Sequence, residues 1–345
     1  KKHAIIPVFI PHLGCPHECV FCDQNAITAR TVPVSGEEVK NTIDTWLSTI
    51  EERGIENVEI SFYGGSFTAI PIDLQTKYLK IGYEYVKAGR VSHLHLSTRP
   101  DYIDDEILTN LKKYKVGAIE LGVQSFSDDV LLRSQRGHDT ACVYKACELI
   151  RSYGFDLGIQ LMVGLPGDTK ELDIMSAKKT AELKPELARI YPTVVLEGTE
   201  LASMLHDGTY TPLGVENAVD ISKDMYRILA DAGIEIMRVG LKSTDLITPG
   251  SDLGHTYHPA FRQLVEGEIA KEDMEKQIEE HFGKNGPPSD HGLIDITFTS
   301  CERCLSNMSG HKAVNRRWLE NKYPALSLHF RADNSLADNT YIMLK

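Results

Sequence analysis

Short strand-like runs alternate with amphipathic helical stretches along most of this chain, and that alternation restricts its fold more than any other feature. Parallel strands need a long crossover between them, so the pattern predicts a parallel sheet with helices packed on it. The runs with strand character are Ala4–Ile10, Asn57–Tyr63, His93–Thr98, Ala118–Val123, Leu157–Val163 and Arg189–Val195. The helical stretches between them include Gly36–Arg53, Ile72–Ala88, Asp104–Lys113 and Thr140–Tyr153. We therefore expect an α/β fold built as a partial (β/α)6, TIM-like barrel.

The pattern changes near the sequence TPGSDLG, which spans Thr248–Gly254. Before it, a helix at Val215–Ala232 and a strand at Glu235–Leu241 extend the barrel. The elements expected after it are helices at Pro259–Phe282 and Lys312–Lys322 and strands at Leu293–Phe298, Ser327–Arg331 and Thr340–Leu344. We place the barrel in residues 1–247 and a smaller α+β C-terminal region in residues 248–345. In such a barrel the chemistry belongs at the C-terminal ends of the strands.

The charge and the N-terminal sequence exclude several classes of protein. The 345 residues contain 37 Lys and Arg against 49 Asp and Glu, and a net charge of −12 argues against a protein that coats nucleic acid nonspecifically. No apolar run reaches the roughly 20 residues of a membrane-spanning helix. Pro7, Pro11 and His12 interrupt the short apolar run near the N-terminus, which does not resemble a signal peptide. We expect a cytoplasmic protein with no membrane partner, in which the seven cysteines form no disulfide framework.

Three cysteines, Cys15, Cys19 and Cys22, follow the first expected strand with the spacing CxxxCxxC. Three thiolates on one loop can bind a soft metal centre. A tetrahedral zinc site needs a fourth ligand, which His12 or His17 could supply. In a [4Fe–4S] cluster, three thiolates instead leave one iron open for a substrate or cofactor. The spacing favours the cluster, and a nonenzymatic zinc-binding module is the alternative.

With Phe21 before the last cysteine and a β/α barrel around the loop, this motif resembles that of the radical S-adenosylmethionine (SAM) superfamily. The resemblance implies that the three cysteines are metal ligands and that the cofactors are a [4Fe–4S] cluster and SAM. It also implies an external one-electron donor, such as flavodoxin or ferredoxin, whose electron cleaves SAM to a 5′-deoxyadenosyl radical. The protein then positions and shields chemistry that belongs to its cofactors.

Further motifs at the strand ends resemble the SAM-binding segments of that superfamily. The sequence YGGS follows the second strand, with Ser66 where relatives often have an acid. The pattern Gly-Val-Gln-Ser, followed by Arg-Gly-His, resembles the oxygen-independent coproporphyrinogen oxidase group and places Gln124 and Arg136 on SAM. Gln160 stands where relatives often carry Asp, and an amide can still bond a ribose hydroxyl. The cofactor-binding residues that the resemblance implies are Phe21, Gly64, Gly65, Ser66, Ser97, Gln124, Arg136, Gln160, Gly164 and Leu165.

Segments Ala188–Leu201, Gly233–Leu241 and His258–Glu266 resemble the Elp3-like branch, named after the catalytic subunit of Elongator. Elongator attaches an acetyl-derived group to a wobble uridine of tRNA, but these 345 residues leave no room for an acetyltransferase domain. We therefore expect an Elp3-like radical SAM enzyme with tRNA as a candidate substrate and partner. The alternative is a coproporphyrinogen-oxidase-like enzyme for a small molecule. The side chains expected to contact substrate are Tyr191, Glu197, Arg238, Lys242, Tyr257 and His258.

Two features of the C-terminal region carry further alternatives. Cys301 and Cys304 form a second CxxC pair, which suits either a zinc or auxiliary cluster site or two free thiols, and we favour the thiols. The basic residues that follow Gly310 are Lys312, Arg316 and Arg317. They suit either a phosphate-binding patch for RNA, with Trp318 as a stacking face, or a solvated helix with Trp318 in the core.

Overall fold

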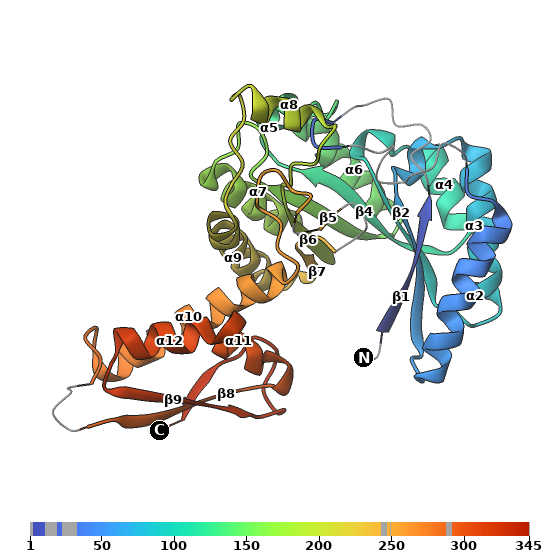
Figure 1. The fold of residues 1–345 in the computed structure, drawn as a ribbon. Helices are drawn as coiled ribbons and strands as arrows, with labels where there is room; N and C mark the ends of the chain where they lie inside the picture. Colours follow the sequence, from blue (N-terminus) through green and yellow to red (C-terminus); the bar gives the residue numbers. More distant parts are fainter. Residues whose placement is uncertain are drawn as a thin grey trace.

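The computed structural model describes residues 3–10, 19–22, 33–242, 247–248, 250–287 and 292–344. Figure 1 shows a strongly curved sheet with helices on its outer side, and a second, smaller lobe joined to it through one long helix. Among the described helices, none is long and apolar enough to cross a membrane.

Seven strands form the large sheet in the order of the sequence. They are β1 (His3–Ile10), β2 (Asn57–Gly64), β3 (His93–Thr98), β4 (Val116–Gln124), β5 (Asp156–Val163), β6 (Leu187–Pro192) and β7 (Glu235–Val239). Every neighbouring pair is parallel, and within the described residues β1 and β7 are the two free edges. The sheet is an open, partial TIM-like barrel, which confirms the predicted fold class.

Helices cover the outer face of this sheet (Figure 1). They are α2 (Gly36–Glu52), α3 (Ile72–Lys87), α4 (Asp105–Lys113), α6 (Thr140–Ser152), α7 (Lys170–Leu183) and α9 (Val215–Asp231). The short helices α5 (Asp128–Arg133) and α8 (Glu200–His206) lie beyond the ends of the strands. Ser35, Asp104 and Asp139 cap α2, α4 and α6 by accepting a backbone N–H of the first turn. The sequence analysis did not identify α5, α7 and α8. In α7 the apolar stripe is weak, because polar residues such as Asp173 are buried.

The two faces of the barrel sheet differ because side chains alternate along each strand. The outer face packs on the helices, and its fully buried residues include Ile60, Leu96, Leu121 and Ile159. The residues one position away on the same strands face the barrel interior, and they are Glu59, His95, Glu120 and Gln160. The interior is therefore polar, whereas the interior of a closed β/α barrel is usually filled by layers of branched apolar side chains.

The sixth strand is shorter than predicted, because β6 ends at Pro192 and not at Val195. The chain leaves the sheet there, since the N–H of Val195 donates to Oδ1 of Asp252 at 2.8 Å. Leu196 also forms an isolated antiparallel bridge with Asp252. The buried Asp252 carboxylate accepts the N–H of Tyr257 at 2.6 Å as well. The segment after the sequence break is thus tied to the end of β6.

The smaller lobe is a three-stranded sheet packed against helices (Figure 1). Its elements are α10 (Phe261–Phe282), β8 (Ile294–Ser300), α11 (Leu305–Ser309), α12 (Val314–Lys322), β9 (Leu326–Ala332) and β10 (Ile342–Leu344). The strand order is β10-β8-β9, with β8 and β9 parallel and β10 antiparallel to β8. The helix predicted from Lys312 begins only at Val314, because Lys312 and Ala313 have left-handed φ angles of 53° and 59°.

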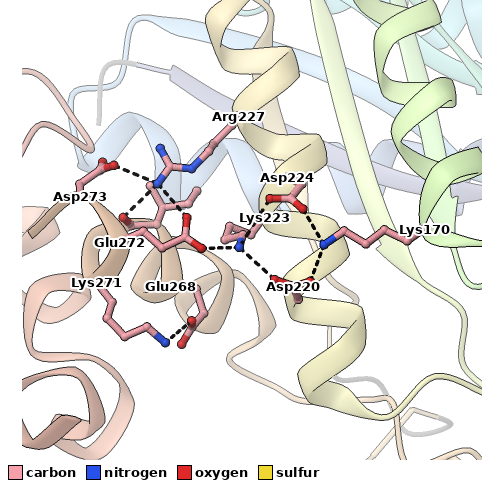
Figure 2. A network of polar contacts seen from close by, with 10 residues as sticks. Lys170, Asp220, Lys223, Asp224, Arg227, Glu268, Lys271, Glu272 and Asp273 are labelled. Atoms are coloured by element: carbon pink, nitrogen blue, oxygen red, sulfur yellow. Dashed lines mark hydrogen bonds and ion pairs between the residues drawn. The ribbon is translucent and has the colours of Figure 1, made fainter. Parts of the chain in front are cut away.

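Charged side chains join α10 to the barrel helices, as Figure 2 shows. The side chain of Lys223 on α9 is 8% exposed, and its ammonium pairs with Asp220 at 2.9 Å and with Glu272 of α10. Arg227 of α9 pairs with Glu272 at 3.2 Å and with Asp273 at 2.9 Å. A buried cation held between carboxylates of two helices is costly to separate. The network therefore holds the smaller lobe in a set orientation relative to the barrel.

Candidate active site

A cavity of about 580 Å³, open mouth included, lies at the C-terminal ends of the first barrel strands. Its lining comes from the segment 19–22, from the ends of β2, β3 and β4, and from β5. Cys19 and Cys22 line it together with eight of the residues predicted to bind the cofactor. These eight are Phe21, Gly64, Gly65, Ser66, Ser97, Gln124, Arg136 and Gln160. The fold thus gathers into one cavity residues that are far apart in the sequence.

The segment 19–22 is a turn whose two cysteines line this cavity. The N–H of Cys22 donates to the carbonyl of Cys19 at 2.9 Å. Between them, the N–H of Val20 donates to the carbonyl of Ser134 at 3.2 Å, and the Val20 carbonyl accepts an N–H of α8 at 2.8 Å. The turn is therefore held by α8 and by the loop after α5. The remaining predicted ligand, Cys15, lies outside the described residues.

Two buried arginines surround the Sγ of Cys19. Arg136 donates from Nη1 at 3.2 Å and Arg99 from Nη1 at 3.6 Å. Arg99 is held by Oδ1 of Asp101 at 2.9 Å, and the Arg136 guanidinium lies 5.9 Å from the centre of the Phe21 ring. Buried cations need a nearby negative charge. A thiolate-bound iron–sulfur cluster would supply one, so the surroundings of Cys19 fit the predicted group.

Two buried polar atoms of the cavity residues have no hydrogen-bond partner within the described residues, Oε1 of Gln124 and Nε of Arg136. Leaving a buried polar group unpaired costs about 1–3 kcal/mol, so these atoms suit a bound ligand. An amide oxygen can accept from an amino group, and a guanidinium N–H can donate to a carboxylate. The methionine part of SAM carries both groups. The two Nη atoms of Arg136 are already engaged, by Cys19 and by the carbonyl of Gly122.

Backbone geometry at the strand ends sets the position of these groups. The pairing of β4 with β5 shifts register between Gly122 and Gln124, and Gln124 has a left-handed φ of 72°. A bulge of this kind redirects a side chain, here that of Gln124, which lines the cavity. At position 64 a different constraint, the close approach of a neighbouring strand, requires glycine. Its φ is 111°, and an added Cβ would lie 2.4 Å from the carbonyl oxygen of Ile10, so the close approach of β1 requires it.

Gly164 and Leu165, also predicted to bind the cofactor, lie outside the lining of this cavity. Leu165 is buried, and the Gly164 carbonyl accepts the hydroxyl of Tyr210 at 2.7 Å. The lining also contains Thr98, Arg99 and Gly122, which are not among the ten predicted cofactor-binding residues. The position of Arg99 could be recognised from the sequence, because this residue directly follows β3. The YGGS sequence lies in the same way at the end of β2.

A buried chain of ion pairs runs across the inner face of the barrel. His95 stands between two carboxylates, with Nε2 2.8 Å from Glu120 and Nδ1 3.4 Å from Glu59. Nε of Arg189 lies 2.5 Å from Oε2 of Glu120. The same Glu120 oxygen accepts Nε2 of Gln160 at 3.0 Å. That bond orients the Gln160 amide and leaves its carbonyl oxygen for a ligand in the cavity.

Each charged group in this network stabilises the charged form of its neighbours, although the groups are buried. Burial lowers the pKa of His95, but hydrogen bonds to Glu120 and Glu59 raise it to about 9. Burial raises the pKa of Glu120, but His95 and Arg189 bring it down to about 2. Both groups are therefore charged at neutral pH. The sequence analysis missed this network, because its members lie on different strands and share no local spacing.

The residues predicted to contact substrate do not form one cluster. Tyr191 and Arg238 lie on the inner face of β6 and β7, where Arg189 donates to the Tyr191 hydroxyl at 3.5 Å. Glu197 and Lys242 are exposed in the loops that follow these two strands. This group borders the open edge of the barrel.

The other two candidates belong to the segment that leads into α10. Tyr257 is buried in a small apolar cluster. The ring of His258 meets the ring of His311 edge-on, with centroids 5.4 Å apart, so it touches the smaller lobe.

The sequence left open whether Trp318 lies in the core or offers a stacking face. Trp318 is 39% exposed, and its ring lies beneath the Lys271 ammonium at 5.1 Å.

Cys301 and Cys304 are buried free thiols in the structure. Their Sγ atoms and a carboxylate oxygen of Asp338 all lie within 4.8 Å of one another. Asp338 is also paired with Arg303. The described residues thus bring together one ligand fewer than a tetrahedral site needs, and one of the three is already engaged.

Comparison with known protein families gives two adjoining matches. A family model described as the radical SAM superfamily matches residues 9–176. A second, described as the radical SAM C-terminal domain, matches residues 185–271. Together they run from β1 into α10, over the barrel, the cysteine segment and the cavity.

Relatives of known sequence or structure agree with these matches. The tRNA uridine(34) acetyltransferase of Methanocaldococcus jannaschii is 28% identical over 257 residues, 63% of this chain and 47% of that protein. An uncharacterised protein of the same archaeon is 30% identical, over 65% of this chain and 71% of its own length. The structure of Methanocaldococcus infernus Elp3 has a TM-score of 0.62 at 21% identity and covers 79% of this chain and 63% of its own. The chain spans about half the length of the tRNA uridine(34) acetyltransferases that it matches.

Proposed function

Since the chain belongs to the radical SAM superfamily, we propose that it cleaves SAM reductively and directs the resulting radical to a tRNA. Enzymes of this superfamily use a [4Fe–4S] cluster and SAM, and the chain is an enzyme with these cofactors. When bound, they supply a 5′-deoxyadenosyl radical. The contribution of the chain is to hold both groups, exclude water and present a substrate.

Cys15, Cys19 and Cys22 would hold the cluster through their thiolates, as their spacing predicts. Two facts support this assignment. Cys19 and Cys22 line one cavity, and Arg99 and Arg136 donate to the Cys19 sulfur. Hydrogen bonds and positive charge at a cluster sulfur raise its reduction potential, so both arginines would make the cluster easier to reduce.

Gln124, Arg136 and Gln160 would orient SAM beside the cluster. Oε1 of Gln124 is free to accept from the amino group, and Nε of Arg136 is free to donate to the carboxylate. Glu120 holds the Gln160 amide so that its oxygen can accept from a ribose hydroxyl. The observation that carries the proposal is this convergence of thiols, guanidiniums and amide groups in one cavity.

The tRNA part of the proposal rests on the relatives. The tRNA uridine(34) acetyltransferases match this chain over 63% of its length. Human Elongator complex protein 3 is 27% identical over 66% of the chain. Because the chain spans only about half of these proteins, we do not propose acetyl transfer for it. We propose only a radical step on a tRNA nucleoside.

The test uses protein purified without oxygen, which should contain about four irons and four sulfides per chain. With SAM and dithionite it should release 5′-deoxyadenosine, and a tRNA with uridine at position 34 should increase the release. A fully loaded protein that releases none would overturn the proposal. Equal release with and without tRNA, and no altered nucleoside by mass spectrometry, would remove tRNA and leave SAM cleavage.

A further inference from the structure

The smaller lobe contains a strand–helix–helix–strand unit that the SAM-binding cavity does not use. β8 and β9 pair in parallel from Ile294 opposite Leu326 to Ser300 opposite Ala332, and α11 and α12 connect them. The loop 310–313 between these helices has the sequence Gly-His-Lys-Ala. KH modules place a Gly-x-x-Gly loop between two helices, where it clamps the backbone of about four nucleotides.

The loop is built and held by packing. Gly310, Lys312 and Ala313 have φ angles of 76°, 53° and 59°, so Ala313 adopts the left-handed conformation that a glycine in its place would favour. A Cβ added to Gly310 would lie 2.7 Å from Cγ of Asn315. The buried Asn315 amide donates to backbone carbonyls of α10 and α11 at 2.7 and 2.9 Å. The loop therefore keeps one shape.

Unpaired positive charge lies at this loop although the chain is acidic as a whole. Lys312 and Arg317 are exposed, and neither has an ion-pair partner within the described ranges. Arg316, by contrast, is held by a carboxylate of its own helix at 3.0 Å. Burial, together with His311 and Lys312, lowers the pKa of the neighbouring His258. Lys312 of the loop and Arg317 of α12 are thus two free cations available to an anionic ligand.

Two cavities flank the unit, and their charges differ. The one on the α9 side is lined by Gly310 and His311 of the loop, and it carries the carboxylates of Glu216, Asp220 and Glu268 against the ammonium of Lys271. The one on the other side lies between the start of α11 and the end of β7, and it carries Arg238 and Lys242. Neither of these two cations has an ion-pair partner among the residues that the structure describes. A phosphate backbone that leaves the loop would be drawn along α11 toward β7 and away from α9.

The loop also lies against the segment that leads from the barrel into α10. His311 of the loop meets His258 with ring centroids 5.4 Å apart. The ion pairs of Lys223 and Arg227 drawn in Figure 2 fix α10, and with it the smaller lobe, on α9. A strand bound at the loop would therefore be held beside the open edge of the barrel.

We propose that the unit formed by β8, α11, α12 and β9 binds single-stranded RNA. Lys312 and Arg317 contact phosphates at the loop, and the strand runs along α11 toward Arg238 and Lys242. The inference rests on the proposed function, because the RNA would be the exposed strand of a tRNA loop. It adds to the proposed function the place in the fold where that RNA is held.

The test compares two double variants of the full chain with the same change in charge. One is Lys312→Asp with Arg317→Asp, and the other is Lys40→Asp with Lys80→Asp, which replaces exposed lysines of α2 and α3. Each is titrated against a fluorescent single-stranded RNA of about 12 nucleotides, three times the footprint of a KH loop. The loop variant should bind at least about tenfold more weakly, and its salt slope should fall by about 1.4 for two lost phosphate contacts. The control pair should match the wild type.

The outcomes separate this inference from the proposed function. Equal losses in both variants would mean that net charge and not the loop binds RNA, which overturns the inference. Unchanged RNA binding in the loop variant overturns it as well, while tRNA-dependent release of 5′-deoxyadenosine by the wild type would still stand. Wild-type protein that binds duplex RNA but no single strand would also overturn it. Unfolding midpoints of both variants should match that of the wild type, because all four side chains are exposed.

Discussion

Nη1 of Arg136 donates a hydrogen bond to the Sγ of Cys19 at 3.2 Å, although 117 residues separate the two in the sequence. Both residues are buried, so the charge acts through little screening. A cation beside a cluster ligand favours the more negative, reduced cluster. In the proposed function, Arg136 would tune the cluster and would also contact SAM through its remaining nitrogen.

Arg136→Gln should lower the midpoint potential of the cluster by about 60 mV, equivalent to a tenfold change in a one-electron equilibrium. It should also weaken SAM binding about 10- to 150-fold, because a charge-assisted bond contributes about 1.5–3 kcal/mol. Potentiometry followed by EPR and equilibrium binding measure the two effects. Arg133→Gln, at an exposed arginine paired with Asp129, is the control. Wild-type values for Arg136→Gln would mean that this residue only supports the barrel wall.

Cys22→Ala should abolish the cluster, because two thiolates do not hold it stably. Iron and sulfide analysis and the visible spectrum of anaerobically purified protein measure the loss. Cys142→Ala, at a partly exposed cysteine of α6, should keep full iron content. A full cluster in Cys22→Ala would contradict the ligand assignment.

Glu120→Gln should reduce the free energy of unfolding by about 3–5 kcal/mol, since it leaves His95 and Arg189 as buried cations without their shared carboxylate. Urea denaturation measures the change. Glu52→Gln, on the exposed side of α2, should stay within about 0.5 kcal/mol of the wild type. Equal stability of the two variants would show that the buried ion pairs contribute nothing net.

The buried network also predicts how stability depends on pH. The pKa of His95 is raised from 6.5 to about 9, so its contribution is fully present below pH 6.5 and is lost as the pH rises through 9. The pKa of Glu120 is lowered from 4.5 to about 2, so its contribution is present above pH 4.5 and is lost as the pH falls toward 2.

His95→Gln tests the alkaline side of this dependence. The difference in unfolding free energy between wild type and variant should shrink between pH 6.5 and 9, as measured by urea titrations at several pH values. His329→Gln, at an exposed histidine paired with Asp295, serves as the control. A constant difference for His95→Gln would mean that this imidazole is neutral in the folded protein.

Ala313→Gly should stabilise the smaller lobe. A left-handed alanine costs about 1–2 kcal/mol, and the greater freedom of glycine in the unfolded chain offsets about 0.4–1 kcal/mol of that. We expect a net gain of about 0.5–1 kcal/mol in thermal or urea unfolding. Ala141→Gly, in the regular helix α6, should instead lose about 0.5–1 kcal/mol. A loss in both variants would contradict the left-handed conformation at Ala313.

Local patterns in the sequence were enough to predict the barrel, and they also identified a candidate cysteine centre. The alternation of strand and helix depends on residues that are close together in the chain, so it predicted β1 to β6 and the strand at Glu235 to within a few residues. The spacing of Cys15, Cys19 and Cys22 lies within one short segment and favoured a [4Fe–4S] cluster over a zinc site. The same reasoning predicted a helix after Gly310 but not its start, because the left-handed turn at Lys312 and Ala313 has no marker in residue type.

Only the tertiary structure revealed which charged residues surround the candidate cysteine centre. Arg99 and Arg136 follow different strands, and parallel pairing around the barrel brings both to Cys19. In the same way, the register of β3 with β4 carries His95 to within 2.8 Å of Glu120. Register between strands depends on the packing of the whole sheet and not on spacing along the chain. The sequence by itself therefore determined which cofactor chemistry this protein supports, and the tertiary structure decided which charges surround it.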